Sequence, residues 1–326
     1  MEHPAATIAI PTYNRARQLY MTIACMVTQK CDFAYEILII NDGSTDETAN
    51  VINRFTHEYK VPIRCVDGKG LGYTHALNKA VREFNTQWIA FCDDDQLTGP
   101  QWLSSLMAAA KRQNALMVGG PVLLDIPEDI LNSLGPVCRD LFGESPDVRE
   151  PERYSVTPPL PSGGNRLVHR KVFEKIGVFD DKMLTGGCDR DFLLRAMAAD
   201  IPMGWAPEAK VRHRISTKRI SYNHIKWYSL QWGCSFAYTD HKYRGIHFLA
   251  GACAARIAQA LCINLPRMLY YRTINDKWKT LDLQALLWRA VGYTRKTLQI
   301  LWPTLFSQEA FFSRVEFRNV SKKSRA

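Results

Sequence analysis

The sequence predicts an α/β protein with a doubly wound sheet and a mostly helical C-terminal extension. Over residues 7–112, short β-branched runs alternate with segments whose apolar residues recur at helical spacing, and this alternation is typical of strands joined by helices. The runs are mostly apolar, as in parallel strands that are covered on both faces. After residue 215 the chain becomes rich in basic and aromatic residues, which predicts a separate extension.

The alternating elements follow one another in a regular order. Strands are expected at 7–11, 36–40, 63–66 and 88–92, and helices at 19–28, 45–59, 74–84 and 101–112. The second helix is typical, because its apolar Val51, Ile52 and Phe55 recur at helical spacing. Ligands of such a sheet gather at the carboxyl ends of its strands.

The pattern becomes irregular at about residues 121–161, where eight prolines occur among charges of both signs. We therefore expect one domain over residues 1–215, interrupted by an irregular insertion, and a basic helical extension over 216–326. Within the domain, further helices are expected near 171–176 and 189–199, and an edge strand over 203–211.

Composition limits the setting and the partners. The chain of 326 residues is long enough to bury a sizeable core, and its nine cysteines are scattered without a Cys-x-x-Cys pair. No signal pattern precedes the first strand, so we expect a reducing, cytoplasmic location. Residues 210–326 carry 21 basic and 5 acidic side chains, a net charge of +16. Such a segment favours a polyanion; because no nucleic-acid motif accompanies it, we expect an anionic membrane surface and no nucleic acid.

Residues 246–271 form the one candidate for a membrane span, and polar residues interrupt it. Arg256 lies near its centre, and an arginine there costs about 2.5 to 3.5 kcal/mol on insertion. We therefore expect a helix that lies in the membrane interface, peripheral on the inner face of the cell membrane. A helical subdomain buried in protein is the alternative.

Three adjacent carboxylates, Asp93, Asp94 and Asp95, follow the apolar run 88–92. They repel one another and cost desolvation energy unless a cation or several donors neutralise them. Hard oxygen ligands favour Mg²⁺ or Mn²⁺, which share their shell with phosphates and water. The run therefore indicates a metal-dependent site for a nucleotide-bearing substrate. The alternative is an acidic cap for the helix that follows.

Four strand-end segments should converge on one crevice: residues 11–15, 41–44, 68–72 and 93–95. In the second of them Asp42 can accept a hydrogen bond from a base N–H. The order and spacing of these segments inform more than any single one, because each is a common turn sequence by itself.

The ordered set PTYNR, NDGSTDET, GLGYTHALNKA, FCDDDQLTGPQWL and GGNRLVHRKVFEKIGVFDDKMLTGGCDRDFLLR resembles the family 2 glycosyltransferases of GT-A fold, over about residues 5–215. The resemblance implies a nucleotide-sugar-binding sheet and an inverting transfer of a hexose from a nucleotide diphosphate donor, expected to be a UDP-sugar, assisted by Mn or Mg. It places Pro11, Thr12, Asn14, Arg15, Asp42, Lys69, Asp93 and Asp94 around the nucleotide sugar. It makes Asp93 and Asp95 the ligands of the metal–diphosphate.

His213 lies between two arginines, 24 residues after Asp189. The resemblance implies that His213 completes the metal shell, and we expect Arg212 and Arg214 to help neutralise the diphosphate. A surface residue or a direct phosphate contact is the alternative for this histidine.

Asp189 is the residue that we expect to act as general base. Inversion by direct displacement needs a group that removes the proton of the acceptor hydroxyl as its oxygen attacks. Asp189 follows two glycines at the start of an expected helix, so a simple helix cap is the alternative. Asp191 and Arg195 are spaced for an ion pair, and Cys188 is expected to be a buried thiol rather than a nucleophile.

Three positions depart from the family pattern. Gly70 and Leu77 replace an Asn and an Arg in N-x-G-x-x-x-A-R-N, and Cys188 replaces the Glu of Gly-Gly-Glu-Asp. These departures put the donor contacts of those side chains in question.

The leading functional hypothesis is an inverting glycosyltransferase of surface polysaccharide biosynthesis in the cell envelope, acting on a glycan or lipid-linked acceptor. A degenerate subunit that binds nucleotide sugar or recruits a partner is one alternative, which the three departures favour. A nucleotidyltransferase is another; it predicts a basic, glycine-rich loop after the first strand, where this chain has Pro11-Thr12-Tyr13-Asn14.

Overall fold

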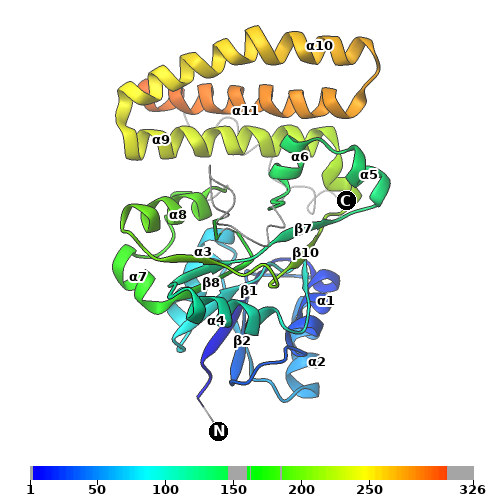
Figure 1. Cartoon of the computed structure of the whole chain (residues 1–326), viewed down its shortest axis with the longest axis vertical. Coiled ribbons are helices and arrows are strands. Elements are labelled where there is room, and N and C mark those ends of the chain that lie inside the picture. Colours follow the sequence, from blue (N-terminus) through cyan, green and yellow to red (C-terminus); the bar gives the residue numbers. More distant parts are fainter. Residues whose placement is uncertain (1–2, 146–159, 162, 184–185, 307–326) are drawn as a thin grey trace. The chain divides into compact units, whose positions relative to one another are not determined.

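The computed structural model describes residues 3–145, 160–161, 163–183 and 186–306. The chain divides into two compact units (Figure 1). The first comprises Met1–Pro127 and Phe142–Ile215, and the second comprises Glu128–Leu141 and Ser216–Ala326. The first unit is mixed α/β and the second is helical, which agrees with the predicted fold class.

A seven-stranded sheet forms the centre of the first unit, in the order β3-β2-β1-β4-β8-β6-β9. Its strands are β1 (Ala6–Thr12), β2 (Tyr35–Asn41), β3 (Ile63–Asp67), β4 (Trp88–Phe91), β6 (Met117–Gly119), β8 (Arg166–His169) and β9 (Met203–Trp205). The first four are parallel, as expected. Strand β8 runs antiparallel to both β4 and β6, which the sequence pattern did not indicate.

Helices cover this sheet: α1 (Ala16–Met26), α2 (Thr48–Glu58), α3 (Tyr73–Glu83), α4 (Trp102–Arg112), α7 (Arg170–Ile176) and α8 (Cys188–Ala198). All of β1, and all of β2 except Asn41, are buried. Helix α1 buries Leu19, Ile23 and Met26 at helical spacing, so its apolar stripe faces the core. The parallel register aligns Thr12 with Asn41, and therefore brings the carboxyl ends of these strands to one edge.

A second, three-stranded sheet has the order β5-β10-β7, with β5 (Gln96–Thr98), β7 (Val122–Asp125) and β10 (Val211–Arg214). Because β5 follows the three aspartates directly and α4 begins only at Trp102, the acidic-cap interpretation of the aspartates is wrong. The edge strand predicted over 203–211 is also wrong as a single strand. It is split between β9 and β10, which belong to different sheets; Pro207 lies between them and lacks the N–H that a ladder needs.

The predicted irregular insertion contains regular elements where the structure describes it. Strand β7 joins the small sheet, while α5 (Glu128–Ser133) and α6 (Pro136–Leu141) belong to the helical unit. The carboxylate of Asp282 accepts hydrogen bonds from the backbone N–H groups of Val137 (3.2 Å) and Cys138 (2.8 Å), and so caps α6. Residues 146–159 lie outside the described part of the chain.

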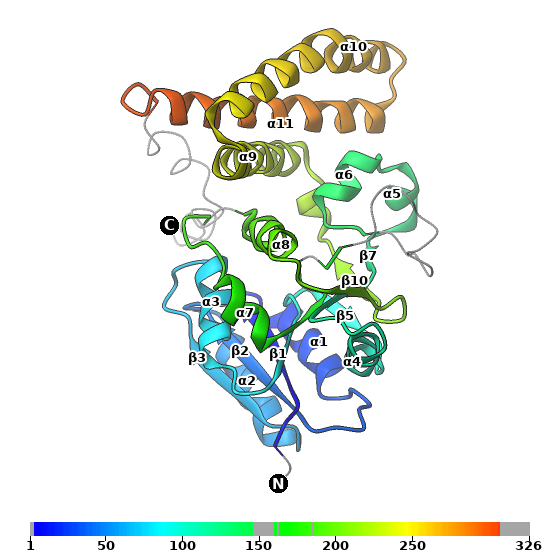
Figure 2. The same cartoon turned by 60° about the vertical axis from the view of Figure 1, so that its left-hand side comes forward.

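The helical unit consists mainly of α9 (Tyr222–Gln259), a π-helical turn (Ala260–Asn264), α10 (Leu265–Thr273) and α11 (Lys277–Leu301), preceded by a 3₁₀ turn (Thr217–Ile220). Gly245, with φ of 80°, breaks α9 and reverses the chain. Both views show α11 lying between the first half of α9 and α10 (Figures 1 and 2). Gly233 and Gly292 permit the close approach of α9 and α11, since a Cβ at either would clash with the facing backbone.

Asn165 holds the first unit together near the end of the sheet. Its Oδ1 accepts from the indole N–H of Trp102 (2.8 Å), and its Nδ2 donates to the carbonyls of Pro121 (3.0 Å) and Ala209 (2.8 Å). The residue is 1% exposed. Three segments that are distant in sequence therefore depend on one amide.

Replacing this amide should destabilise the protein. In Asn165→Ala the buried indole N–H and two carbonyls lose their partner, and we expect a loss of about 2 kcal/mol or more in the free energy of unfolding. Urea unfolding followed by tryptophan fluorescence measures it. The exposed Asn50→Ala is the matched control and should change stability by about 0.5 kcal/mol or less. Equal stabilities of the two variants would contradict the role of Asn165.

Candidate active site at the carboxyl ends of the strands

Three carboxylates lie at the end of β4. Asp94 and Asp95 are 4% and 5% exposed, and Asp93 is half-buried. A Cβ at Gly164 would clash with the Asp93 carboxylate, which explains why glycine precedes Asn165. Burying charges in this way is costly unless cations or donors surround them.

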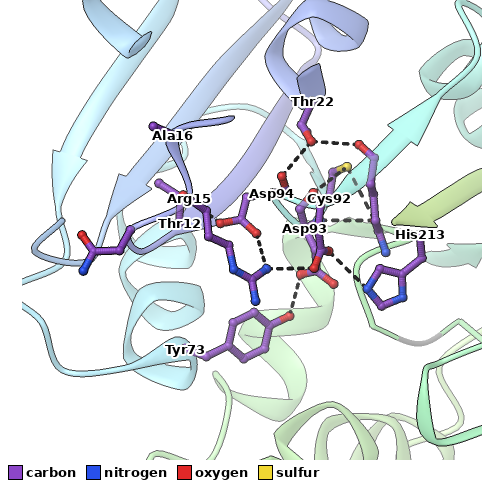
Figure 3. A network of polar contacts seen from close by, with 12 residues as sticks. Thr12, Arg15, Ala16, Thr22, Tyr73, Cys92, Asp93, Asp94 and His213 are labelled. Carbon is purple, nitrogen blue, oxygen red and sulfur yellow. Dashed lines mark hydrogen bonds and ion pairs between the residues drawn. The ribbon is translucent and has the colours of Figure 1, made fainter. Parts of the chain in front are cut away.

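Arg15 supplies one of these cations. Its Nη1 donates to Oδ1 of Asp94 (2.7 Å) and to Oδ2 of Asp95 (2.8 Å). The hydroxyl of Thr12 donates to the other oxygen of Asp94 (2.8 Å). Figure 3 shows Arg15 and Thr12 pointing from the end of β1 towards the aspartates. The structure thus brings together three of the residues predicted to surround the nucleotide sugar.

His213 approaches the cluster from the opposite side, on β10 (Figure 3). It stands opposite Gln96 in the β5–β10 pairing, and its Nε2 lies 3.2 Å from Oδ1 of Asp95. Its Nδ1 lies 2.9 Å from the carbonyl of Phe142, so Nδ1 must carry the proton. In the neutral tautomer the lone pair of Nε2 therefore faces a carboxylate, and only a proton or a cation can join two such acceptors.

The cluster retains excess negative charge. Burial raises the pKa of Asp93 to about 6; the neighbouring Asp95 acts in the same direction, and His213 acts against it. Burial also raises the pKa of Asp94, although Arg15 opposes the shift. The hydroxyl of Tyr73 donates to Asp93 (3.0 Å, Figure 3). A raised carboxyl pKa means that the ionised form is disfavoured in the folded protein, so a bound cation would relieve the cluster.

The predicted metal ligands lie near one another but do not form a complete coordination shell. Among the described residues, no group of three or more His, Cys, Asp or Glu side chains is arranged to hold a metal ion. Asp95 and His213 are in contact, and Asp93 interacts electrostatically with both. Their oxygen and nitrogen donors suit Mn²⁺ or Mg²⁺ when other ligands complete the shell.

The other predicted strand-end segments also meet here. The carboxylate of Asp42 accepts from the backbone N–H groups of Leu71 (2.9 Å) and Gly72 (2.8 Å), so it fixes the glycine-rich loop. Oδ1 of Asn14 accepts from the N–H of Thr45 (2.7 Å) and ties the loop after β1 to the turn after β2. Pro11 is buried within β1, whereas Lys69 is exposed after β3. A direct contact of these residues with a nucleotide stays a prediction.

Asp189 lies in the first turn of α8, and its partner was not identified from the sequence. Its Oδ1 is 2.6 Å from Nη2 of Arg166, a residue on β8 that is 1% exposed. The guanidinium of Arg166 stands over three phenylalanine rings, Phe91, Phe179 and Phe192, with centroid distances of 5.0, 4.8 and 5.8 Å. Aromatic faces stabilise a cation that has lost its hydration. Arg166 occurs in the GGNRLVH segment, but its strand pairing with Phe91 is visible only in three dimensions.

The side chains near α8 explain several other predictions. The predicted pair of Asp191 and Arg195 is confirmed, with an Nε–Oδ2 distance of 2.9 Å. Asn78 donates to and accepts from the backbone of Phe179 (both 2.9 Å), which anchors the segment before α8 on α3. Leu77, which replaces an arginine of the family pattern, is 1% exposed.

Arg212 and Arg214, predicted to neutralise a diphosphate, both lie near Asp125 instead. Their side-chain nitrogens are 2.7 Å and 3.7 Å from its carboxylate. Their charge is therefore partly compensated within the small sheet.

The fold and the polar residues at its strand ends can now be compared with those of known proteins. The chain belongs to glycosyl transferase family 2, whose model matches residues 7–177. Among curated relatives, the chondroitin synthase of Escherichia coli is 32% identical over 219 residues, which are 57% of this chain and 31% of that protein. The hyaluronan synthase of Pasteurella multocida is 28% identical over 220 residues, 59% of this chain and 22% of that protein. The chain thus spans less than a third of the length of these relatives.

The fold also resembles that of a solved glycosyltransferase structure. The mannosyltransferase PcManGT from Pyrobaculum calidifontis, in complex with GDP-Man and Mn²⁺, superposes with a TM-score of 0.58 at 18% identity. The superposition covers 93% of this chain and 89% of that one. This likeness confirms the predicted GT-A fold.

Cys188 should be chemically inert in the folded protein. It is 1% exposed, and burial, together with the nearby Asp189, raises the pKa of its thiol, so little thiolate exists near neutral pH. A short iodoacetamide pulse followed by mass spectrometry should modify the exposed Cys262 and leave Cys188 free until the protein is unfolded. Alkylation of both at similar rates would rule out the buried-thiol assignment.

Proposed function

We propose that the protein is a metal-dependent, inverting glycosyltransferase that transfers a hexose from a nucleoside diphosphate sugar, expected to be a UDP-sugar, to a hydroxyl of a glycan or lipid-linked acceptor. One arrangement supports this proposal above the others. A carboxylate cluster with excess negative charge lies at the strand ends, and the negative charge of Asp189 is near enough to contribute to the raised pKa of Asp93. A site for the cation that would bind the diphosphate and a carboxylate that could act as base are therefore near each other, as direct displacement requires.

The cluster has the chemistry of a divalent cation site. Asp95, His213 and Asp93 would hold the ion, and the lone pair of His213 that faces the Asp95 carboxylate supports this assignment. When bound, Mn²⁺ or Mg²⁺ supplies positive charge that stabilises the leaving diphosphate. Arg15 is already paired with Asp94 and Asp95, so it orients these carboxylates for the ion, and it opposes the rise in the pKa of Asp94.

Asp189 would accept the proton of the acceptor hydroxyl. One of its oxygens is paired with Arg166, and the side chain as a whole remains 26% exposed. Pairing one oxygen fixes the orientation of the carboxylate and leaves the other free to take a proton. Arg166 is therefore proposed as a positioning residue, held by the phenylalanine rings beneath it.

Matched relatives support a glycan as the acceptor. Two of them carry the names chondroitin synthase and hyaluronan synthase, and these names, with the family membership, support a role in surface polysaccharide biosynthesis. The alternative of a nucleotidyltransferase is not favoured, because the chain after β1 folds into helix α1 without a basic glycine-rich loop.

Removing Asp95 should abolish metal-dependent donor binding. In the wild-type protein, one nucleotide sugar of a panel of UDP-, GDP- and dTDP-sugars should raise the thermal unfolding midpoint only with Mn²⁺, since a ligand at 100 times its dissociation constant adds about 2.7 kcal/mol. Asp95→Ala and the size-matched Asp95→Asn should lose this shift, while the exposed Asp32→Ala should keep it. Stabilisation that is independent of Mn²⁺ in the wild type would contradict the metal assignment.

Asp189→Asn should nearly abolish transfer and retain donor binding. The amide preserves shape and removes basicity, so we expect kcat to fall by about 10² to 10⁴. Calorimetric donor affinity and turnover are measured on one preparation. Asp191→Asn is the matched control on the same helix; it weakens the ion pair with Arg195 and should lower stability more than turnover. Wild-type turnover in Asp189→Asn would exclude this residue as the base.

Variants of Arg166 test the positioning role. Arg166→Met keeps the packing on the rings and removes the cation, and we expect kcat to fall by about 10² with little change in KM for the donor. Arg166→Lys should recover part of the loss.

If the wild-type protein binds nucleotide sugar but transfers nothing to any glycan acceptor, the alternative of a degenerate, donor-binding subunit is supported instead.

A further inference from the structure

The helix that follows Gly245 directs an arginine into the protein and large apolar side chains outwards. Tyr222–Thr273 is long and apolar enough to cross a membrane by length and composition, but Gly245 breaks it. The part after this break, residues 246–273, is called the apolar helix below. It consists of the end of α9, the π-helical turn and α10.

One side of the apolar helix is buried within the helical unit. Its buried residues include Leu249, Cys253, Ala260 and Asn264, at spacings of four, seven and four. Arg256 belongs to the same side, because its guanidinium stands 4.4 Å from the ring centroid of Tyr293 on α11. The arginine that interrupts the apolar sequence is therefore directed into the protein.

The opposite side is exposed and almost entirely apolar. Its large exposed apolar residues include Phe248, Ile257, Leu261, Ile263, Leu269 and Tyr270. Between residues 248 and 266, all of which the structure describes, Gln259 is the single polar residue among those exposed. Contiguous exposed apolar surface of this kind marks an interaction site.

Basic residues lie at both ends of this exposed face. Lys242 and Arg244 precede it, Arg267 and Arg272 end it, and all four are exposed. No acidic residue occurs from His241 to Asn275. An apolar strip between basic ends is complementary to a layer whose interior is hydrocarbon and whose surface is anionic.

We infer that the apolar helix lies in the plane of an anionic membrane surface, such as the cytoplasmic face of a cell membrane, with its exposed side in the acyl boundary. A transmembrane orientation is disfavoured, because α11 packs along the helix and carries Asp282, Arg289 and Lys296. A second copy of the chain is disfavoured, because the basic ends of two such faces would repel each other. The inference is independent of the glycosyltransferase proposal.

Vesicle flotation tests this inference with the full chain. The protein should float with vesicles of phosphatidylcholine and phosphatidylglycerol, float less with phosphatidylcholine alone, and be partly released by salt, because exposed charges are screened within about 8 Å at physiological ionic strength. Leu261→Glu and Leu269→Glu should each weaken the partition by about tenfold or more, since a leucine loses its apolar burial. Arg267→Gln with Arg272→Gln should reduce the preference for phosphatidylglycerol.

A matched control separates this effect from a general effect of added charge. Met197→Glu on α8 changes a residue as exposed as Leu269, at 49%, and should float like the wild type. All these side chains are exposed, so unchanged thermal midpoints are expected. Three results would overturn the inference: no flotation with any vesicle, release by detergent alone, or a dimer that Leu261→Glu dissociates in the absence of flotation.

Discussion

The burial of three consecutive carboxylates at the end of β4 is the constraint on which the rest of the site depends. An isolated buried carboxylate costs several kcal/mol, and three neighbours also repel one another. The structure meets this cost with groups from three separate segments. Arg15 arrives from the end of β1, Tyr73 from α3 and His213 from β10. The positions of these elements are therefore linked, since displacing any one leaves a buried charge without its partner.

The small sheet and the antiparallel strand β8 place the other charged residues of the site. Pairing of β10 with β5 sets His213 opposite Gln96, one residue after Asp95. Pairing of β8 with β4 sets Arg166 opposite Phe91, so a cation enters the core beside the strand that ends in the aspartates. Phenylalanine rings replace its hydration, and Asp189 is its counter-ion. The site thus contains the aspartate cluster, whose negative charge is only partly compensated, and Asp189, which is paired with Arg166. These two environments are suited to different chemical roles.

Local patterns made much of this predictable, and non-local pairing explains what was missed. Parallel strands and their helices follow from apolar periodicity within short windows, and the converging strand ends follow from their parallel order. The short β5, β6 and β7 have three or four residues each and are defined by partners far away in sequence, so no window reveals them. Nothing in the sequence indicated the role of Arg166, because its aromatic surroundings come from three separate segments. The same reason hid the orientation of Arg256, whose partner Tyr293 lies on another helix.

Both units place side chains where folding alone does not favour them. In the first, carboxylates are buried although their ionised forms are disfavoured there. In the second, an arginine faces the helix bundle while leucine and isoleucine side chains face outwards. A core leucine and a surface aspartate would each stabilise the fold better, because apolar burial is favourable and charge burial is not. The proposed cation at the strand ends and the proposed membrane surface beside the apolar helix would each make the arrangement more favourable. The sites at which the chain departs from stable packing are therefore those at which the two proposals place a binding partner.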